Sequence, residues 1–225
     1  MSYRTLSKVE LASRVAMDIP DGSYVNLGIG MPTTIASYLP PDRDLVFHSE
    51  NGILGMGPTP LSSLEDEDLV NAGKEPVSLV PGAALFHQAD SFAIVRGGHL
   101  DICVLGAFQV SQFGDLANWS TGAEDAVPAV GGAMDLAVGA RQTWVMMKLL
   151  TAEGVSKLVP TCTYPLTARA CVSRIYTDHG TVECTPAGLR IVDLVEGLAH
   201  REFEQLIGMS VLPEVSDDDG NHGVA

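Results

Sequence analysis

One carboxylate, Glu50, stands in the segment HSENGILGMGP, which runs from His48 to Pro58. The acid follows a polar pair and precedes a glycine-rich run, and it has no second carboxylate beside it. Paired carboxylates are typical of glycosidases, whereas a lone carboxylate suits nucleophilic attack. An electrophile that a carboxylate attacks reversibly is an activated acyl group such as a thioester. From its spacing alone, an ordinary acid on a surface loop remains the simpler interpretation of Glu50.

Several glycine-rich segments follow the apolar runs that predict strands. Glycine lets a ligand approach the backbone closely and leaves amide N–H groups free to hold an oxyanion. Open α/β sheets bind ligands at the carboxyl ends of their strands. The sequence therefore predicts that four segments converge on one cleft: residues 28–32, residues 49–57, Gly82 and residues 131–132.

The common nucleotide and hydrolase motifs are incomplete. Gly28-Ile29-Gly30 follows a predicted strand, as in a dinucleotide-binding fingerprint, but Thr33 occupies the third glycine position. Gly73-Lys74 is followed by Glu75, so it is not a phosphate-binding P-loop. The sequence contains neither G-x-S-x-G nor H-E-x-x-H. These absences weigh against nucleotide-binding, serine-hydrolase and zinc-protease functions.

The histidines and cysteines show no metal-ligand spacing. We expect packed or surface histidines at positions 48, 87, 99, 179, 200 and 222. We expect buried thiols, rather than disulfides or ligands, at Cys103, Cys162, Cys171 and Cys184. Ion pairs are the simplest prediction for Asp90, Arg96 and Asp101.

The composition is globular and acidic. Of the 225 residues, 13 are Lys or Arg and 28 are Asp or Glu, which gives a formal net charge of -15. Such a surface repels phosphate backbones, so nucleic acid and anionic membranes are not expected partners. No apolar run approaches the roughly 20 residues that span a bilayer. The polar start MSYRTLSKVELASRV lacks a secretory pattern, and we expect a cytoplasmic protein.

Helices and strands alternate in the first part of the chain. Ser7 and Glu10 have the spacing of a capping box, and apolar residues then recur at helical intervals until Pro20. A strand is predicted over residues 25–29 and a helix over residues 32–39. Residues 45–47 form a short predicted strand, which places Glu50 at a strand's carboxyl end.

The remaining segments complete an α/β pattern. Buried strands are predicted at 77–80, 102–105 and 143–147, a helix within 131–140, antiparallel strands at 174–178, 180–185 and 188–194, and a helix at 201–207. The predicted fold is a layered open sheet with flanking helices and an antiparallel C-terminal strand region. We expect one domain over residues 1–212 and an acidic, disordered tail over 213–225.

A family resemblance sharpens these expectations. SENG, preceded by VNLGIGMPT and followed by GGAMDL, resembles the β subunits of the family I CoA-transferases, the 3-oxoacid CoA-transferases. The similarity runs from about Ser7 to Leu212. The segments GGHLDICVLGAFQVS, GDLANWSTGAE and CTYPLTARACVSRIYTD are most similar to members that pass CoA from succinyl-CoA to 3-oxoadipate. Members acting on acetoacetate or short fatty acids share the same active-site motifs.

The resemblance assigns roles to individual residues. The family's nucleophile falls on Glu50, which would carry CoA as a glutamyl thioester, and its oxyanion-stabilising asparagine falls on Asn26. Contacts to bound CoA or substrate are implied at Gly28, Gly30, Asn51, Gly52, Lys74, Gly131 and Gly132. The chain departs from the family pattern at Leu149, Ala152 and Ala168.

The family also implies a partner and a set of substrates. Its enzymes contain an α and a β part, so we expect an α subunit and a complex of two α and two β chains. Succinyl-CoA and a 3-oxo acid would be the substrates, with no metal or other cofactor. Two alternatives use the same residues: a non-catalytic acyl-CoA-binding module and a CoA-ester hydrolase.

Overall fold

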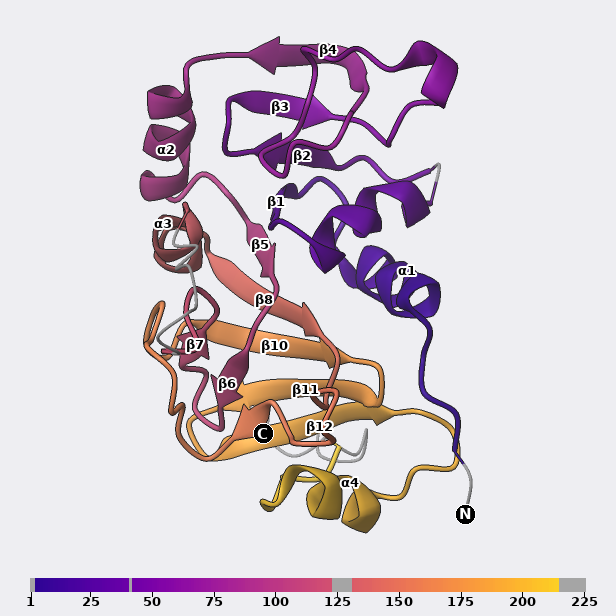
Figure 1. Ribbon diagram of the computed structural model, residues 1–225, viewed down its shortest axis with the longest axis vertical. Coiled ribbons are helices and arrows are strands. Elements are labelled where there is room, and N and C mark those ends of the chain that lie inside the picture. The colour runs from indigo at the N-terminus through magenta and orange to yellow at the C-terminus, as the bar shows by residue number, and fades with distance from the viewer. Residues whose placement is uncertain (1–2, 41, 123–130, 215–225) are drawn as a thin grey trace, which may run out of the picture.

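A nine-stranded sheet organises the molecule, a computed structural model that describes residues 3–40, 42–122 and 131–214 (Figure 1). Its strand order is β12-β11-β10-β8-β5-β1-β2-β3-β4. The strands are β1 (Tyr24–Leu27), β2 (Val46–Ser49), β3 (Ile53–Met56), β4 (Leu79–Leu85), β5 (Ile102–Leu105), β8 (Gln142–Met147), β10 (Val172–Thr177), β11 (Gly180–Thr185) and β12 (Gly188–Leu194). The central strands β2, β1, β5, β8 and β10 are parallel. Antiparallel strands β11 and β12 extend one edge, and β3 and β4 extend the other.

Helices cover both faces of this sheet, as the predicted layered fold requires. They are α1 (Lys8–Asp18), α2 (Gln88–Arg96), α3 (Ala133–Gly139), α4 (His200–Ile207) and the 3-10 helices η1 (Met31–Tyr38) and η2 (Ser62–Leu64). Ile102 and Val104 of β5 pack into a core that includes α1 and η1. Cys103 and Leu105 point the other way, into a core built with α2, α3 and α4. Alternate side chains of one strand thus bind two helical layers.

Local sequence signals account for several of these elements. The predicted capping box at Ser7 and Glu10 is confirmed, since Glu10 N–H donates to Ser7 Oγ at 3.2 Å and Ser7 N–H donates to Glu10 Oε2 at 2.8 Å. The predicted strand at 102–105 is confirmed without change, and the predicted antiparallel C-terminal strands are also confirmed.

Other predictions were wrong at the opposite edge. The predicted buried strand at 77–80 is instead β4, which begins at Leu79, lies at the sheet's edge and is largely exposed. Strand β3 occupies a segment that was predicted as a glycine-rich loop, because Gly55 and Gly57 hide its alternation. Ile29 lies beyond the end of β1 and is exposed.

A small second sheet was not predicted. It contains β6 (Gln109–Ser111), β7 (Leu116–Ala117) and β9 (Leu158–Val159) in the order β7-β6-β9. Strands of two or three residues are too short to show a period in the sequence. The sheet lies beside the parallel strands in Figure 1, on the side of α3.

The outer parts of the chain leave two predictions open. Leu212 pairs with β12, since Ile191 N–H donates to Leu212 O at 3.0 Å. Most of the predicted tail, residues 215–225, lies outside the described residues together with His222, so the domain limits stay a prediction. Within the described ranges, no helix is long and apolar enough to cross a membrane.

Candidate active site

Glu50 lies where strand β2 ends and turns sharply into β3. The turn is closed by a hydrogen bond from Gly52 N–H to Ser49 O at 3.0 Å. Gly52 has a φ of 116°, and a Cβ there would lie 2.0 Å from Phe86 O, so glycine is required. The carboxylate is therefore held on a short turn between two paired strands, which confirms the predicted position at a strand's carboxyl end.

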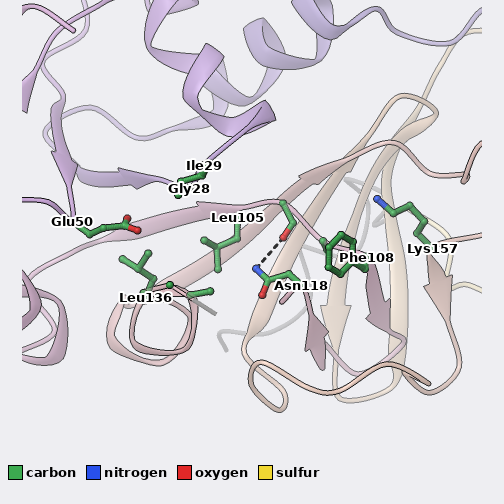
Figure 2. A pocket seen from close by; sticks show the side chains of 13 residues that line it. Gly28, Ile29, Glu50, Leu105, Phe108, Asn118, Leu136 and Lys157 are labelled. Atoms are coloured by element: carbon green, nitrogen blue, oxygen red, sulfur yellow. Dashed lines mark hydrogen bonds between the residues drawn. The ribbon is translucent and has the colours of Figure 1, made fainter. Parts of the chain in front are cut away.

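A cavity of about 390 Å³ opens beside this turn. Figure 2 shows the residues that line it: Gly28, Ile29, Glu50, Leu105, Gly106, Ala107, Phe108, Asn118, Gly131, Gly132, Ala133, Leu136 and Lys157. The predicted convergence of the loops after β1, β2 and before α3 is confirmed. Gly82 does not take part, because it lies in the exposed edge strand β4.

Other residues that the resemblance singled out lie elsewhere. Gly30, Asn51, Gly52 and Lys74 are not among the described lining residues. Asn51 donates through Nδ2 to Val70 O at 2.7 Å, and Lys74 lies exposed on a turn with a φ of 62°. Their predicted contacts with CoA or substrate stay predictions.

Burial sets the electrostatics of Glu50. The residue is only 9% exposed. Burial raises the pKa of its carboxyl group, while a hydrogen bond from Asn26 and one from its own backbone oppose the rise. A carboxylate with little hydration is a stronger nucleophile than one in bulk water, provided that it is ionised.

A buried hydrogen-bonded chain lies under Glu50. Asn26 and His48 are paired in register on β1 and β2, and Asn26 Nδ2 lies 3.0 Å from His48 Nδ1 and 3.2 Å from His48 O. Because the amide nitrogen only donates, Nδ1 must accept, so the ring proton lies on Nε2. Nε2 then donates to Ser91 Oγ at 2.8 Å.

This chain is electrically neutral. Burial lowers the pKa of His48 to about 4, so the ring carries no charge at neutral pH. Cys103 Sγ lies 3.7 Å from Asn26 Oδ1, and burial raises the pKa of the thiol well above its ordinary value. The arrangement fixes the Asn26 amide without adding a charge that would compensate Glu50.

Three parts of the cavity wall were missed by sequence reasoning. The loop 106–108 follows β5, and Asn118 donates through Nδ2 to Gly106 O at 3.1 Å. Lys157 contributes from the segment before β9. The strand end at Leu105 gave a signal for the loop, but Lys157 lies in a segment without periodicity or a motif.

The predicted roles of the other polar residues are largely confirmed. All four cysteines are free thiols; Cys103 is buried and the other three are half-buried. Arg96 pairs with Asp135 at 2.8 Å and Asp101 with Arg141 at 2.7 Å, whereas Asp90 forms no ion pair within the described ranges. In the same ranges no cluster of three or more His, Cys, Asp or Glu residues could hold a metal. The expectation that catalysis needs no cofactor stays a prediction.

Gly132 offers a direct test of the cavity. A Cβ at this position would lie 2.8 Å from Phe92 Cζ and 3.5 Å from Glu50 Oε1. We expect Gly132→Ala to lower kcat/KM for acyl transfer from CoA thioesters roughly ten- to hundredfold, because the methyl group displaces Phe92 or the nucleophile. Gly106→Ala is the matched comparison, since its Cβ would meet nothing within 4 Å. A larger loss in Gly106→Ala than in Gly132→Ala would contradict this geometry.

Comparison with known proteins places these residues in context. The sequence model of the family described as Coenzyme A transferase matches residues 8–194. The chain is 60% identical over 209 residues to the β subunit of the 3-oxoadipate CoA-transferase of Pseudomonas putida, and the match covers 93% of this chain and 98% of the relative. It is 44% identical over 195 residues to the β subunit of the succinyl-CoA:3-ketoacid coenzyme A transferase of Helicobacter pylori, covering 87% of this chain and 93% of the relative.

A solved structure shares the fold. An acyl-CoA transferase of Escherichia coli O157:H7, determined as a thioester complex with CoA, matches with a TM-score of 0.71 and 16% identity. The match covers 95% of this chain and 42% of that longer chain. At this identity the likeness shows a common fold.

Proposed function

The chain belongs to the coenzyme A transferase family, and from this premise we propose that it is the catalytic β subunit of an enzyme that moves CoA from succinyl-CoA to 3-oxoadipate. The observation that carries the proposal is the buried Glu50 carboxylate at the wall of a glycine-lined cavity. The choice of 3-oxoadipate is supported by the name of the relative at 60% identity.

The proposed reaction proceeds through covalent intermediates on Glu50. The ionised carboxylate attacks the carbonyl carbon of succinyl-CoA, and the CoA thiolate leaves to give a mixed anhydride of succinate and Glu50. The thiolate then attacks the Glu50 carbonyl carbon, succinate leaves, and CoA is bound to Glu50 as a thioester. The carboxylate of the acceptor acid repeats these steps in reverse.

The surroundings of Glu50 suit this chemistry. Leu105, Phe108 and Leu136 give the cavity an apolar wall that limits the access of water, which would hydrolyse the anhydride and the thioester. The solved acyl-CoA transferase with the same fold was captured as a thioester complex with CoA. That precedent supports a thioester intermediate here.

Asn26 is proposed to donate to the oxyanion that forms at each attack. Its Nδ2 group donates to His48 in the absence of substrate, so donation to an oxyanion requires one of these hydrogen bonds to be exchanged. We expect Asn26→Ala to lower kcat by about 3 kcal/mol of transition-state stabilisation, or roughly a hundredfold, with a smaller change in KM. An effect on KM alone would show that Asn26 positions substrate instead.

The acceptor acid is the least determined part of the proposal. The relative from H. pylori is named for 3-ketoacids in general, so acetoacetate and short-chain acids are the alternative acceptors. The test is an assay of the chain, co-expressed with an α subunit, against succinyl-CoA and a panel of acids. The highest kcat/KM should be found with 3-oxoadipate.

The same assay separates two other functions. Release of free CoA without any acceptor acid would indicate a hydrolase. Binding of acyl-CoA with no exchange would indicate a non-catalytic binding module. Either result would refute the transferase proposal.

A further inference from the structure

The cavity beside Glu50 contains a second charged group. Among its described lining residues, Glu50 and Lys157 are the two with ionisable side chains. Figure 2 shows them at opposite ends of the cavity, with Leu105, Asn118 and Phe108 between them. A molecule that reaches both would present a carbonyl group at one end and an anion at the other.

Lys157 is held firmly by its backbone. Its N–H donates to Leu149 O at 2.9 Å, and its carbonyl accepts from Val110 N–H at 2.9 Å. These hydrogen bonds connect the segment after β8 to the small sheet. The start of the Lys157 side chain is therefore fixed relative to the cavity wall.

The ammonium group of Lys157 lacks a close counterion. No salt bridge or side-chain hydrogen bond to Lys157 is formed within the described ranges. Asp178 is the acidic residue that acts on it electrostatically, but the Asp178 carboxylate already accepts hydrogen bonds from Leu149 N–H and His179 Nδ1, each at 2.9 Å. Burial lowers the pKa of Lys157, as expected for a cation that has lost hydration without gaining a partner.

An adjoining cavity of about 360 Å³ shares Lys157 with the first. The two cavities also share Gly106 and Ala107, and the second adds Lys148 and Thr151. Lys157 thus stands where the cavities meet. Acids of different lengths could reach its ammonium group, because a longer chain has the second cavity to extend into.

We propose that Lys157 binds the distal carboxylate of dicarboxylic substrates while their reacting carboxyl group lies at Glu50. The proposal rests on the function proposed above and names a subsite within it. Succinyl-CoA and 3-oxoadipate both carry such a carboxylate, and the apolar residues between the two charges suit the intervening methylene groups. The phosphates of CoA are a less suitable partner, because they lie at the far end of the pantetheine arm from the thioester carbonyl.

The test compares acceptors in the assembled complex. Transfer through a covalent intermediate is ping-pong, so kcat/KM for the acceptor reports its reaction with the CoA-loaded enzyme and not the donor's binding. We expect Lys157→Met to lower kcat/KM for 3-oxoadipate about ten- to hundredfold more than for acetoacetate, which has no distal carboxylate. Lys8→Met removes the same charge from the exposed start of α1 and should leave the ratio of the two values unchanged.

Changing the substrate provides an independent measurement. In the unchanged enzyme, the ester of 3-oxoadipate at its distal carboxyl group should react more slowly than the free acid. In Lys157→Met, or in Lys157→Gln if the first variant does not assemble, the two should become nearly equal. Equal losses for 3-oxoadipate and acetoacetate, or a loss confined to KM for succinyl-CoA, would overturn the subsite. A complex that transfers no CoA to any acid would instead refute the proposed function itself.

Discussion

Replacing Glu50 by glutamine is expected to reduce CoA transfer by at least about 10⁴-fold, because the amide cannot form the covalent intermediate. Glutamine keeps the size of the side chain and an oxygen that accepts from Asn26. The fold should therefore be retained. The measurement is the rate of 3-oxoadipyl-CoA formation by the assembled complex, with Glu65→Gln, an exposed acid, as the control.

The same substitution has an opposite expected effect on stability. Burial raises the pKa of Glu50 in the folded protein, so at neutral pH the ionised side chain opposes folding. Glu50→Gln should unfold at an equal or higher temperature than the unchanged chain near pH 7. The difference should vanish as the pH falls below the ordinary carboxyl pKa, where Glu50 is protonated in both states. A Glu50→Gln protein that is folded and retains a tenth of the activity would contradict the nucleophilic role.

Transfer is also expected to be undetectable when this chain is present without an α subunit. The described lining of the cavity has one cation and no arginine, which is too little to hold the phosphates of CoA. Large apolar side chains are exposed at its rim and nearby, with Ile29 59%, Val138 73% and Val155 61% exposed. Exposed apolar surface of this kind is typical of a protein–protein interface, and an obligate one is expected to be large and apolar.

Expression of the chain alone and with the α subunit tests this expectation. Light scattering should show a complex with the mass of two α and two β chains, and only that complex should transfer CoA. A lone chain that converts succinyl-CoA and 3-oxoadipate at the rate of the complex would refute the requirement for a partner.

Sequence patterns predicted the centre of the sheet better than its margins. Strand β5 and the capping box of α1 depend on local residues, and both were predicted correctly. Strand β4 was misplaced because it pairs at an exposed edge, where no burial pattern forms. The helix over 31–38 is a 3-10 helix rather than an α-helix; Thr33 and Thr34 donate through Oγ1 to the carbonyls three residues earlier, Gly30 and Met31, which an apolar pattern does not reveal.

The active site was predictable where it depends on sequence motifs. Glu50, Gly28 and Gly132 lie at strand or helix ends that the sequence already marked, and they meet in one cavity. Lys157 reaches the cavity through the pairing of β9 with β6, which is a long-range contact between very short strands. The hydrogen bond of His48 to Ser91 similarly depends on the packing of α2 against the sheet. Such contacts follow from the tertiary structure and leave no local signal.

The central claim is that CoA becomes covalently bound to Glu50. Peptide mass spectrometry of the assembled complex, incubated with succinyl-CoA and no acceptor acid, tests it most directly. We expect CoA on the peptide that contains Glu50, with release of succinate, and reduction of that residue to an alcohol by borohydride. The adduct should be absent from Glu50→Gln. CoA attached to another residue, or continued transfer with no adduct and no sensitivity to borohydride, would contradict the nucleophilic role of Glu50.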